Sequence, residues 1–308
     1  MPILQTHQLE FYFRKGQPIV RQVDLSVPKG SIFGFLGPNG AGKTTTIRLM
    51  LGLLRASGGR VEIFGQELES NRSELFQKIG SLIEQPSLYL HLTGEQNLEI
   101  ARRYTQVPAS RIPEVLAMVG LQAAARKRAG AYSLGMKQRL GLAIALLHQP
   151  ELVILDEPTN GLDPAGIIEM RELLKTLNRD HGITFFVSSH LLAEVERMCT
   201  HVGIIHQGKL LFQGSIEELQ SAQVQKRSVQ LETSNIEQAE ALLRQQYSVQ
   251  RLSNGKLSIP FESKSQVAAL NQSLVLAGFE VYELSLQGAD LEEMFLEITG
   301  PLRMESLV

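Results

Sequence analysis

One stretch of the chain constrains its fold more than any other. It comprises Gly37, Pro38, Asn39, Gly40, Ala41, Gly42, Lys43 and Thr44, and it fits the pattern G-x-x-x-x-G-K-[ST] at every fixed position. A short apolar run at 31–36 precedes the pattern, and apolar residues at helical spacing follow it over 45–51. The stretch therefore lies between a predicted strand and a predicted helix, which is the context that a phosphate-binding loop requires.

The residue types of this loop suit phosphate. Glycine tolerates backbone conformations that are closed to other residues, so successive N–H groups of the loop can point at phosphate oxygens. The positive end of the following helix, where Thr45 lies, adds to the attraction. Lys43 would reach the β- and γ-phosphates of a nucleotide, and the hydroxyl of Thr44 would ligate Mg²⁺.

Apolar runs of strand length alternate with helical patterns over residues 1–218, which predicts an α/β fold with a parallel sheet. Residues from about 88 to 148 are expected to form a helical insertion, in which Thr93 to Gln96 have the spacing of a capping box. Ser133 is predicted to cap a helix that runs to about residue 148, and Asp163 to cap another. The predicted strands are 3–13, 20–27, 31–36, 61–64, 79–83, 152–155 and 183–187, with a hairpin at 202–212 turning at 207–208.

The composition shifts after residue 214, and 308 residues favour two domains over one. The patterns at 228–286 predict the order strand, helix, strand, strand, helix, strand, consistent with a small α+β ferredoxin-like domain at 219–308. A further helix is expected at 290–299. This domain could regulate the chain, mediate dimerisation, bind a ligand or brace a dimer. We favour the bracing role.

Asp156 and Glu157 directly follow the unbroken apolar run 152–155, which is typical of a strand buried on both faces. Carboxylates in this position lie at the carboxyl end of a central strand, where α/β sheets place their ligands. His190 follows the next buried strand after Ser188 and Ser189. These side chains, together with the phosphate loop, are the candidate site.

Taken in order, these motifs resemble the nucleotide-binding subunit of ATP-binding cassette (ABC) transporters over about residues 1–214. In that family the phosphate loop is followed by a glutamine-bearing loop, a signature motif opening a helix, an Asp-Glu pair, a D-loop and a switch histidine. This chain has a counterpart of each. The resemblance implies a P-loop NTPase core with a helical insertion, and an ATPase that uses ATP and Mg²⁺.

The resemblance also implies roles for individual residues. Asp156 would hold Mg²⁺, Glu157 would orient the water that attacks the γ-phosphate, and His190 would contact that phosphate. Lys43, Mg²⁺ and the loop N–H groups would stabilise the negative charge on the phosphoryl group while it is transferred to water. Cys199 is the only cysteine and is expected to be a small buried apolar residue.

Two motifs depart from the commonest family pattern. The signature reads Tyr-Ser-Leu-Gly-Met at 132–136 instead of Leu-Ser-Gly-Gly-Gln, but it keeps Ser133 and Gly135. A hydroxyl and a backbone N–H at a helix N-terminus can both bind a γ-phosphate. In the family they act on the nucleotide of the opposite protomer, which implies a homodimer or pseudo-dimer. Asp163, the last residue of the D-loop at 160–163, would be both a helix cap and a contact across that dimer.

The second departure is in the glutamine-bearing loop. Glu84 occupies the usual glutamine position and Gln85 lies one place on, so either could supply an oxygen near Mg²⁺. The aromatic residue that stacks on adenine in this family should lie near residue 13. Phe13 fits best, and an apparent extra residue before Val20 leaves Tyr12 open.

One branch of the family, the exporters that include bacitracin-resistance and lantibiotic-immunity transporters, is similar to this chain in three features. These are the signature sequence, Glu84 in the glutamine-bearing loop and the C-terminal extension. The longest apolar stretch, 140–147, is far short of the about 20 residues of a membrane span. We therefore expect a cytoplasmic chain, peripheral on the inner face of the cell membrane. It would move separate integral-membrane subunits through the helical insertion and the loop at 84–93.

A formal net charge of −2 argues against nucleic acid as a partner. The alternative from another class is an ATP-switched interaction protein that acts on a soluble or ribosomal partner. A single phosphate loop disfavours the tandem-cassette form of that alternative.

Overall fold

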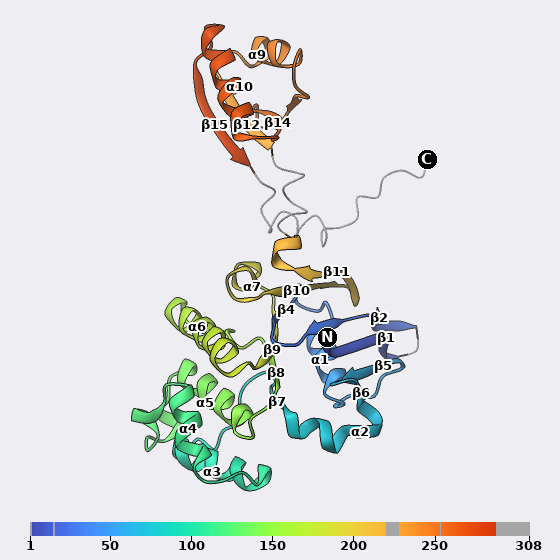
Figure 1. Cartoon of the computed structure of the whole chain (residues 1–308), viewed down its shortest axis with the longest axis vertical. Coiled ribbons are helices and arrows are strands. Elements are labelled where there is room, and N and C mark those ends of the chain that lie inside the picture. The colour runs from blue at the N-terminus through green and yellow to red at the C-terminus, as the bar shows by residue number, and fades with distance from the viewer. Residues whose placement is uncertain (1, 15, 220–227, 253, 288–308) are drawn as a thin grey trace. The chain divides into compact units, whose positions relative to one another are not determined.

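The computed structural model describes residues 2–14, 16–219, 228–252 and 254–287. The chain divides into two compact units, residues 1–216 and 217–308 (Figure 1). Each unit has its own buried apolar core.

A six-stranded sheet runs through the first unit in the order β11-β10-β4-β9-β8-β7. Neighbouring strands from β10 to β7 are parallel, and β11 pairs antiparallel with β10. Every residue of β4, β8 and β9 is buried, because these strands are covered on both faces. The strands are β4 (Ile32–Leu36), β7 (Ile79–Leu82), β8 (Leu152–Asp156), β9 (Thr184–Ser189), β10 (His201–His206) and β11 (Lys209–Ser215). The parallel sheet predicted from the apolar runs is therefore present.

The predicted hairpin turn is confirmed at Gln207 and Gly208, which join β10 to β11. Both have positive φ, 47° and 78°, which matches the twist of a two-residue hairpin turn.

A second, antiparallel sheet has the order β2-β1-β5-β6, and β3 also pairs with β1. Its strands are β1 (Pro2–Arg14), β2 (Gln17–Val23), β3 (Ser26–Pro28), β5 (Gly58–Ile63) and β6 (Gln66–Glu67). The single strand predicted at 20–27 is wrong, because the chain breaks between β2 and β3. The buried hydroxyl of Thr6 bridges the break: it donates to the Val23 carbonyl (2.7 Å) and accepts from the Leu25 N–H (2.9 Å).

Helix α1 (Lys43–Met50) joins the two sheets in one core. Its side chains Ile47 and Met50 are fully buried, together with aromatic residues of the parallel sheet and aliphatic residues of the antiparallel sheet. The rings of Phe33 and Phe186 stack in this core with centroids 5.6 Å apart. Because α1 follows the phosphate loop, this packing holds the loop against the sheet.

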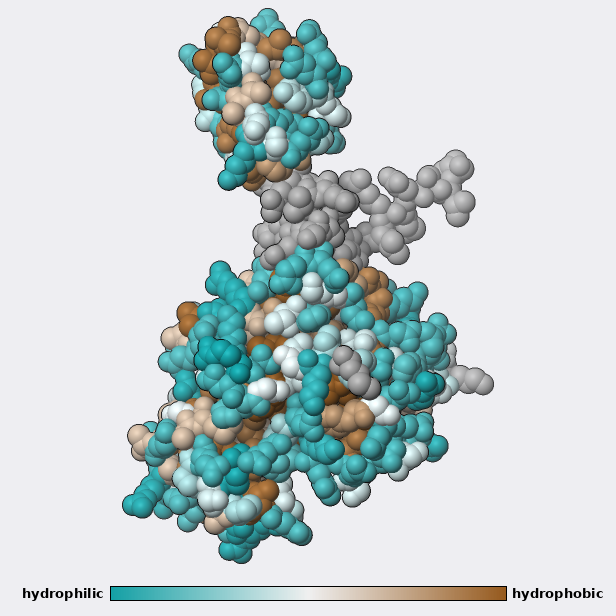
Figure 2. All heavy atoms as spheres, viewed as in Figure 1, coloured by the Kyte–Doolittle hydropathy of each residue, from teal (hydrophilic) through white to brown (hydrophobic). Residues whose placement is uncertain are grey.

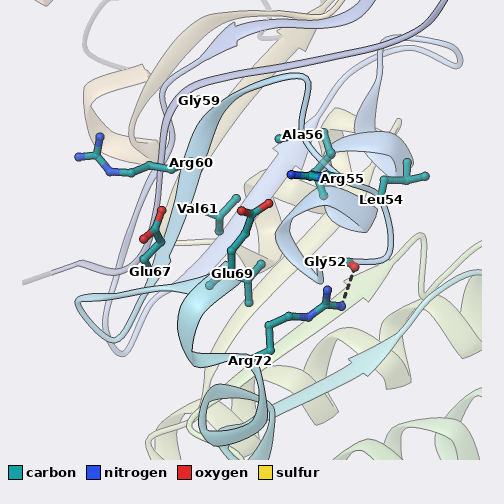
Figure 3. Close-up of a pocket in the computed structure, with 12 residues that line it drawn as sticks. Gly52, Leu54, Arg55, Ala56, Gly59, Arg60, Val61, Glu67, Glu69 and Arg72 are labelled. Carbon is teal, nitrogen blue, oxygen red and sulfur yellow. Dashed lines mark hydrogen bonds between the residues drawn. The ribbon is translucent and has the colours of Figure 1, made fainter.

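Helix α2 (Leu68–Leu75) was not predicted, since only its first and last residues are buried and the six between them are polar or charged. It nevertheless forms a hydrogen bond with the chain just after the end of α1. A guanidinium nitrogen of Arg72 donates to the Gly52 carbonyl at 2.7 Å, as the dashed line in Figure 3 shows. The two residues line a hollow of about 320 Å³, at the end of α1 remote from the phosphate loop.

The helical insertion is present as α3 (Gly94–Thr105), α4 (Arg111–Met118) and α5 (Leu134–Leu146), which lie together in Figure 1. Thr93 and Gln96 form the predicted capping box, and residues 106–110, which include Pro108, separate α3 from α4. Residues 122–124 and 129–131 form short 3₁₀ turns instead of continuing a helix. Helices α6 (Pro164–His181) and α7 (Leu192–Met198) complete the first unit.

The second unit contains a four-stranded antiparallel sheet with the order β13-β14-β12-β15. Along the chain the elements are β12 (Ser228–Thr233), α9 (Ile236–Leu243), β13 (Gln250–Arg251), β14 (Leu257–Pro260), α10 (Lys264–Leu276) and β15 (Val281–Gln287). The observed order of strands and helices is the predicted one. The helix expected at 290–299 lies outside the described residues.

In the described part of the chain, the helices are too short or too polar to cross a membrane.

Candidate active site

The phosphate loop connects β4 to α1 and requires its glycines. Gly40 and Gly42 have φ of 80° and 106°, a region that residues with a side chain rarely adopt. A Cβ added to Gly37 would fall 2.4 Å from the Ile205 carbonyl oxygen, so β10 packs directly against the loop. The loop lines a hollow of about 510 Å³, called the phosphate hollow below, bounded by Ile19, Asn39, Gly40, Gly42, Lys43, Thr44, Thr45, Glu157, Asn160 and His190.

Lys43 is buried, with a relative exposure of 6%. Its ammonium donates to the Gly37 carbonyl (2.7 Å) and lies 3.2 Å from Oε1 of Glu157. A buried ammonium needs such partners because burial without them is costly. The ammonium is therefore positioned inside the loop, where an incoming phosphate would meet it.

Asp156 ends β8 and is 2% exposed. The hydroxyl of Thr44 donates to its Oδ2 at 2.8 Å, and the hydroxyl of Ser188 donates to its Oδ1 at 2.6 Å. Asp156 and Ser188 are register partners on the neighbouring strands β8 and β9, which places the two side chains together. A carboxylate and a hydroxyl in contact are oxygen ligands of the kind that Mg²⁺ prefers, so the residues present fit that ion.

Glu157 follows Asp156 with φ of 50°, in the left-handed region that a non-glycine residue enters at some cost in free energy. Its N–H donates to Oγ of Ser188 (2.9 Å), which supports this conformation. Oε2 of Glu157 lies 2.8 Å from Nδ1 of His190, and Oε1 faces Lys43. The structure thus brings the three predicted catalytic side chains together, with the carboxylate between the ammonium and the imidazole.

The predicted base-stacking residue lies at the end of β1. The ring of Phe13 is 67% exposed, and it packs edge-on against the Phe11 ring with centroids 4.8 Å apart. Tyr12 is 38% exposed. Both lie outside the described lining of the phosphate hollow, although Ile19 of the paired strand β2 belongs to that lining. An exposed ring at this point offers a free face for a base.

Glu84 and Gln85 are the two candidates for the glutamine-bearing loop. Glu84 has φ of 58° and forms an ion pair with Arg48 of α1, with Oε1 2.5 Å from the guanidinium. Both partners are exposed, and Gln85 is exposed as well. Neither residue is among the described lining residues of the phosphate hollow, to which Thr44 belongs.

Ser133, Gly135 and Asp163 lie in a different hollow, of about 570 Å³, called the signature hollow below. Its lining is Gly120, Leu121, Ala123, Ala124, Ser133, Leu134, Gly135, Met136, Arg139, Gly161, Leu162, Asp163, Ala165, Gly166 and Glu169. Ser133 caps α5 by accepting from the Met136 N–H (3.2 Å), and Asp163 caps α6 by accepting from the Gly166 N–H (3.0 Å). Both predicted caps are confirmed. Among the described residues, the two hollows have no lining residue in common.

Sequence reasoning missed two residues of the site. Ser188 contacts both acidic residues, and its only signal was a polar residue at the end of an apolar strand. Asn160 lines the phosphate hollow, where its N–H donates to the Glu157 carbonyl at 3.0 Å. From the sequence, Asn160 is only the first residue of the D-loop.

Known proteins that are similar to this chain include ATP-binding proteins, in agreement with the phosphate loop and the carboxylates of this site. The family described as ABC transporter matches residues 20–160, and an AAA domain family (putative AbiEii toxin, Type IV TA system) matches residues 125–196. Bacitracin transport ATP-binding protein BcrA of Bacillus licheniformis is 42% identical over 92% of this chain and 94% of its own length. Lantibiotic transport ATP-binding protein SrtF of Streptococcus pyogenes is 41% identical over 67% of this chain and 91% of its own.

Among solved structures, cbiO1 from Clostridium perfringens, part of the ABC transporter complex cbiONQ, superposes with a TM-score of 0.66. It is 27% identical and covers 71% of this chain and 91% of its own. The fold, the phosphate loop and the strand-end carboxylates therefore agree with the sequence comparisons. The chain belongs to the ATP-binding subunits of ABC transporters and is an ATPase.

Proposed function

We propose that this chain powers the export of a peptide antibiotic or a similar drug through separate integral-membrane subunits. BcrA and SrtF, named for bacitracin and lantibiotic transport, support that substrate class, and the BcrA match extends over nearly the whole chain. The observation that carries the ATPase role is the position of Glu157 between Lys43 and His190, next to the Thr44–Asp156 pair.

The reaction is in-line attack of water on the γ-phosphate of ATP. The N–H groups of residues 37–45 and the ammonium of Lys43 hold the phosphates, and the phosphate displaces Glu157 as the partner of Lys43. Glu157 is then free to orient and polarise the water, while His190 contacts the γ-phosphate. Thr44 and Asp156 would hold Mg²⁺, with Glu84 or Gln85 as a further ligand, and the ion would supply positive charge to neutralise the phosphate oxygens.

Two copies of the ATP-binding unit form a homodimer or pseudo-dimer in this proposal. Ser133 and Gly135 lie in a hollow separate from the phosphate hollow of the same chain. An exposed helix N-terminus that carries a hydroxyl is suited to a phosphate from a second copy. Asp163, in the same hollow, then lies at the boundary between the copies. Phe13 stacks on adenine within its own copy.

The helical insertion and the loop at 84–93 dock on the membrane subunits. The visible face of the first unit is mostly hydrophilic, with hydrophobic residues gathered in patches (Figure 2). Tyr89 and Leu90 of the loop and Tyr104 of α3 are more than half exposed. A hollow of about 490 Å³ on α3 is lined by Leu92, Gln96, Glu99, Ile100, Arg103 and Tyr104. Exposed apolar side chains around a hollow suit a protein partner, which supports this docking role. In this proposal the chain lies at the cytoplasmic face of the membrane.

We assign residues 1–218 to the ATP-binding domain, with its insertion at about 88–148, and residues 219–308 to a ferredoxin-like accessory domain that braces the dimer. The division of the chain after Ile216 supports this boundary. The sheet order β13-β14-β12-β15, with two helices in a β-α-β-β-α-β chain, supports the ferredoxin-like fold.

Co-purification tests the proposed function. A tagged Glu157→Gln chain is expressed in its own host, membranes are solubilised in mild detergent with ATP, and the captured proteins are identified. A polytopic membrane protein in near-equal amount is expected, and a parallel Lys43→Ala chain without ATP controls for nucleotide dependence. A soluble or ribosomal partner, with the chain absent from membranes, would overturn the transporter role and leave the catalytic assignments in place.

A further inference from the structure

Glu194, on the short helix α7, joins two segments of the active site. Its Oε2 accepts a hydrogen bond of 2.6 Å from the hydroxyl of Thr159 and one of 3.4 Å from the hydroxyl of Ser189. Thr159 lies two residues after Glu157, and Ser189 directly precedes His190. One carboxylate oxygen therefore ties the segment that carries Glu157 to the segment that carries His190.

Thr159 and Ser189, the two donors to Glu194, are well shielded from water. Thr159 is 8% exposed and Ser189 is 2% exposed. The second carboxylate oxygen of Glu194, Oε1, is buried and has no hydrogen-bond partner among the described residues. A buried acceptor without a donor costs folding free energy, because its hydrogen bonds to water are lost. A side chain retained at this cost is a candidate for a role in the chemistry.

Thr159 begins a turn that reaches both hollows. The Asn160 N–H donates to the Glu157 carbonyl, and the Leu162 N–H donates to the Thr159 carbonyl. Asn160 lines the phosphate hollow, whereas Leu162 lines the signature hollow. The position of Thr159 therefore determines where this turn presents its side chains on each side.

We propose that Glu194 is a positioning residue: through Thr159 and Ser189 it holds the turn after Glu157 in register with the segment carrying His190. The carboxylate and the imidazole lie 2.8 Å apart, a contact that depends on the relative position of these two segments. Glu194 lies outside the described lining of the phosphate hollow, so it acts on turnover and leaves ATP affinity unchanged. This inference rests on the proposed roles of Glu157 and His190.

The test uses the full-length chain and four variants. Thr159→Val removes the hydroxyl at equal volume, Thr159→Ser keeps it, Glu194→Ala removes the acceptor, and Glu194→Gln keeps an acceptor oxygen. Glu74→Ala, at an exposed position on α2, is the matched control. Steady-state kinetics give kcat and KM, binding of a fluorescent ATP analogue gives affinity, and thermal unfolding gives Tm.

We expect Thr159→Val and Glu194→Ala each to lower kcat by about tenfold, because a small misplacement of a catalytic group is costly. ATP affinity stays within about twofold, and Thr159→Ser and Glu194→Gln stay within about threefold of the wild type, since both keep the hydrogen bond. The double variant Thr159→Val/Glu194→Ala is no slower than Glu194→Ala, because both changes remove one interaction.

Wild-type kcat in Thr159→Val, or losses that multiply in the double variant, would overturn the inference. If Glu194→Ala does not fold, the comparison of Thr159→Val with the wild type still tests the inference, since this substitution replaces only the hydroxyl, and Thr159→Ser is the control that keeps it. Glu157→Gln is measured in parallel to distinguish the catalytic role of Glu157 from the positioning role of Glu194. Wild-type turnover in Glu157→Gln refutes the role of Glu157 itself, whereas slow turnover there with normal Thr159→Val refutes the positioning role alone.

Discussion

The ammonium of Lys43 lies 3.2 Å from the carboxylate of Glu157, so these two residues form an ion pair inside the phosphate hollow. One partner is suited to hold phosphate and the other to activate water. Because the two charges are paired with each other, a γ-phosphate that draws Lys43 away would also release Glu157. In the proposed mechanism, phosphate binding and activation of the carboxylate are thereby linked through one contact.

Changing Glu157 to glutamine should lower kcat by about 10²- to 10⁴-fold, the range for loss of a general base. ATP affinity should be retained, because the loop and Lys43 still hold the phosphates. Phosphate release and fluorescent-nucleotide binding measure the two quantities, with Glu74→Gln as the exposed control. A wild-type rate in Glu157→Gln would remove that residue from the mechanism.

Changing Lys43 to alanine should weaken ATP binding by at least about tenfold, because a charge-assisted contact to phosphate is lost. The substitution also leaves Glu157 without its ammonium partner in the hollow. Equilibrium titration with a fluorescent ATP analogue measures the affinity, and Lys209→Ala on β11 is the exposed control. Unchanged affinity would show that Lys43 lies outside the phosphate site.

Changing Thr44 to valine should raise the Mg²⁺ concentration for half-maximal ATPase activity by about tenfold. The substitution removes the hydroxyl that donates to Asp156 at 2.8 Å and that would supply an oxygen ligand to the ion. Thr44→Ser keeps the hydroxyl and should titrate close to the wild type. Identical Mg²⁺ titrations of Thr44→Val and Thr44→Ser would contradict a role of this hydroxyl in metal binding.

The thiol of Cys199 should be almost unreactive in the folded chain. Burial raises the pKa of Cys199, the negative charge of Glu194 raises it further, and the thiolate is the reactive form. Labelling with a disulfide reagent between pH 7 and 9 should be at least about 100-fold slower than in denaturant and should accelerate about tenfold per pH unit. Cys199 is the only cysteine, so the signal is unambiguous. Rapid labelling of the folded chain would show that the thiol is accessible.

Local patterns predicted most of the first unit correctly. The buried strands, the capping box at Thr93 and the caps Ser133 and Asp163 each depend on neighbours within a few residues, so their signals are complete in the sequence. Helix α2 was missed because it buries only two side chains and has no clear apolar face. The strand predicted at 20–27 was wrong because its break is stabilised by Thr6, which is distant in sequence.

The candidate site shows the same difference between features that depend on sequence neighbours and features that depend on distant residues. The phosphate loop and the Asp-Glu pair were evident from residue types and their order. The contacts of Ser188 with Asp156, of Glu84 with Arg48 and of Glu194 with Thr159 were not, because each joins residues more than thirty positions apart. Such contacts depend on strand register and helix packing, which spacing alone does not specify.

The sequence by itself determined that the chain carries a phosphate loop before a helix, buried strands ending in carboxylates, and a signature segment at a helix N-terminus. These features follow from short-range backbone and side-chain preferences. Only the tertiary structure decided that Lys43, Glu157 and His190 meet in one hollow while Ser133 and Asp163 lie in another. The physical reason is that β4, β8 and β9 pair in parallel, which brings the ends of distant segments to the same edge of the sheet.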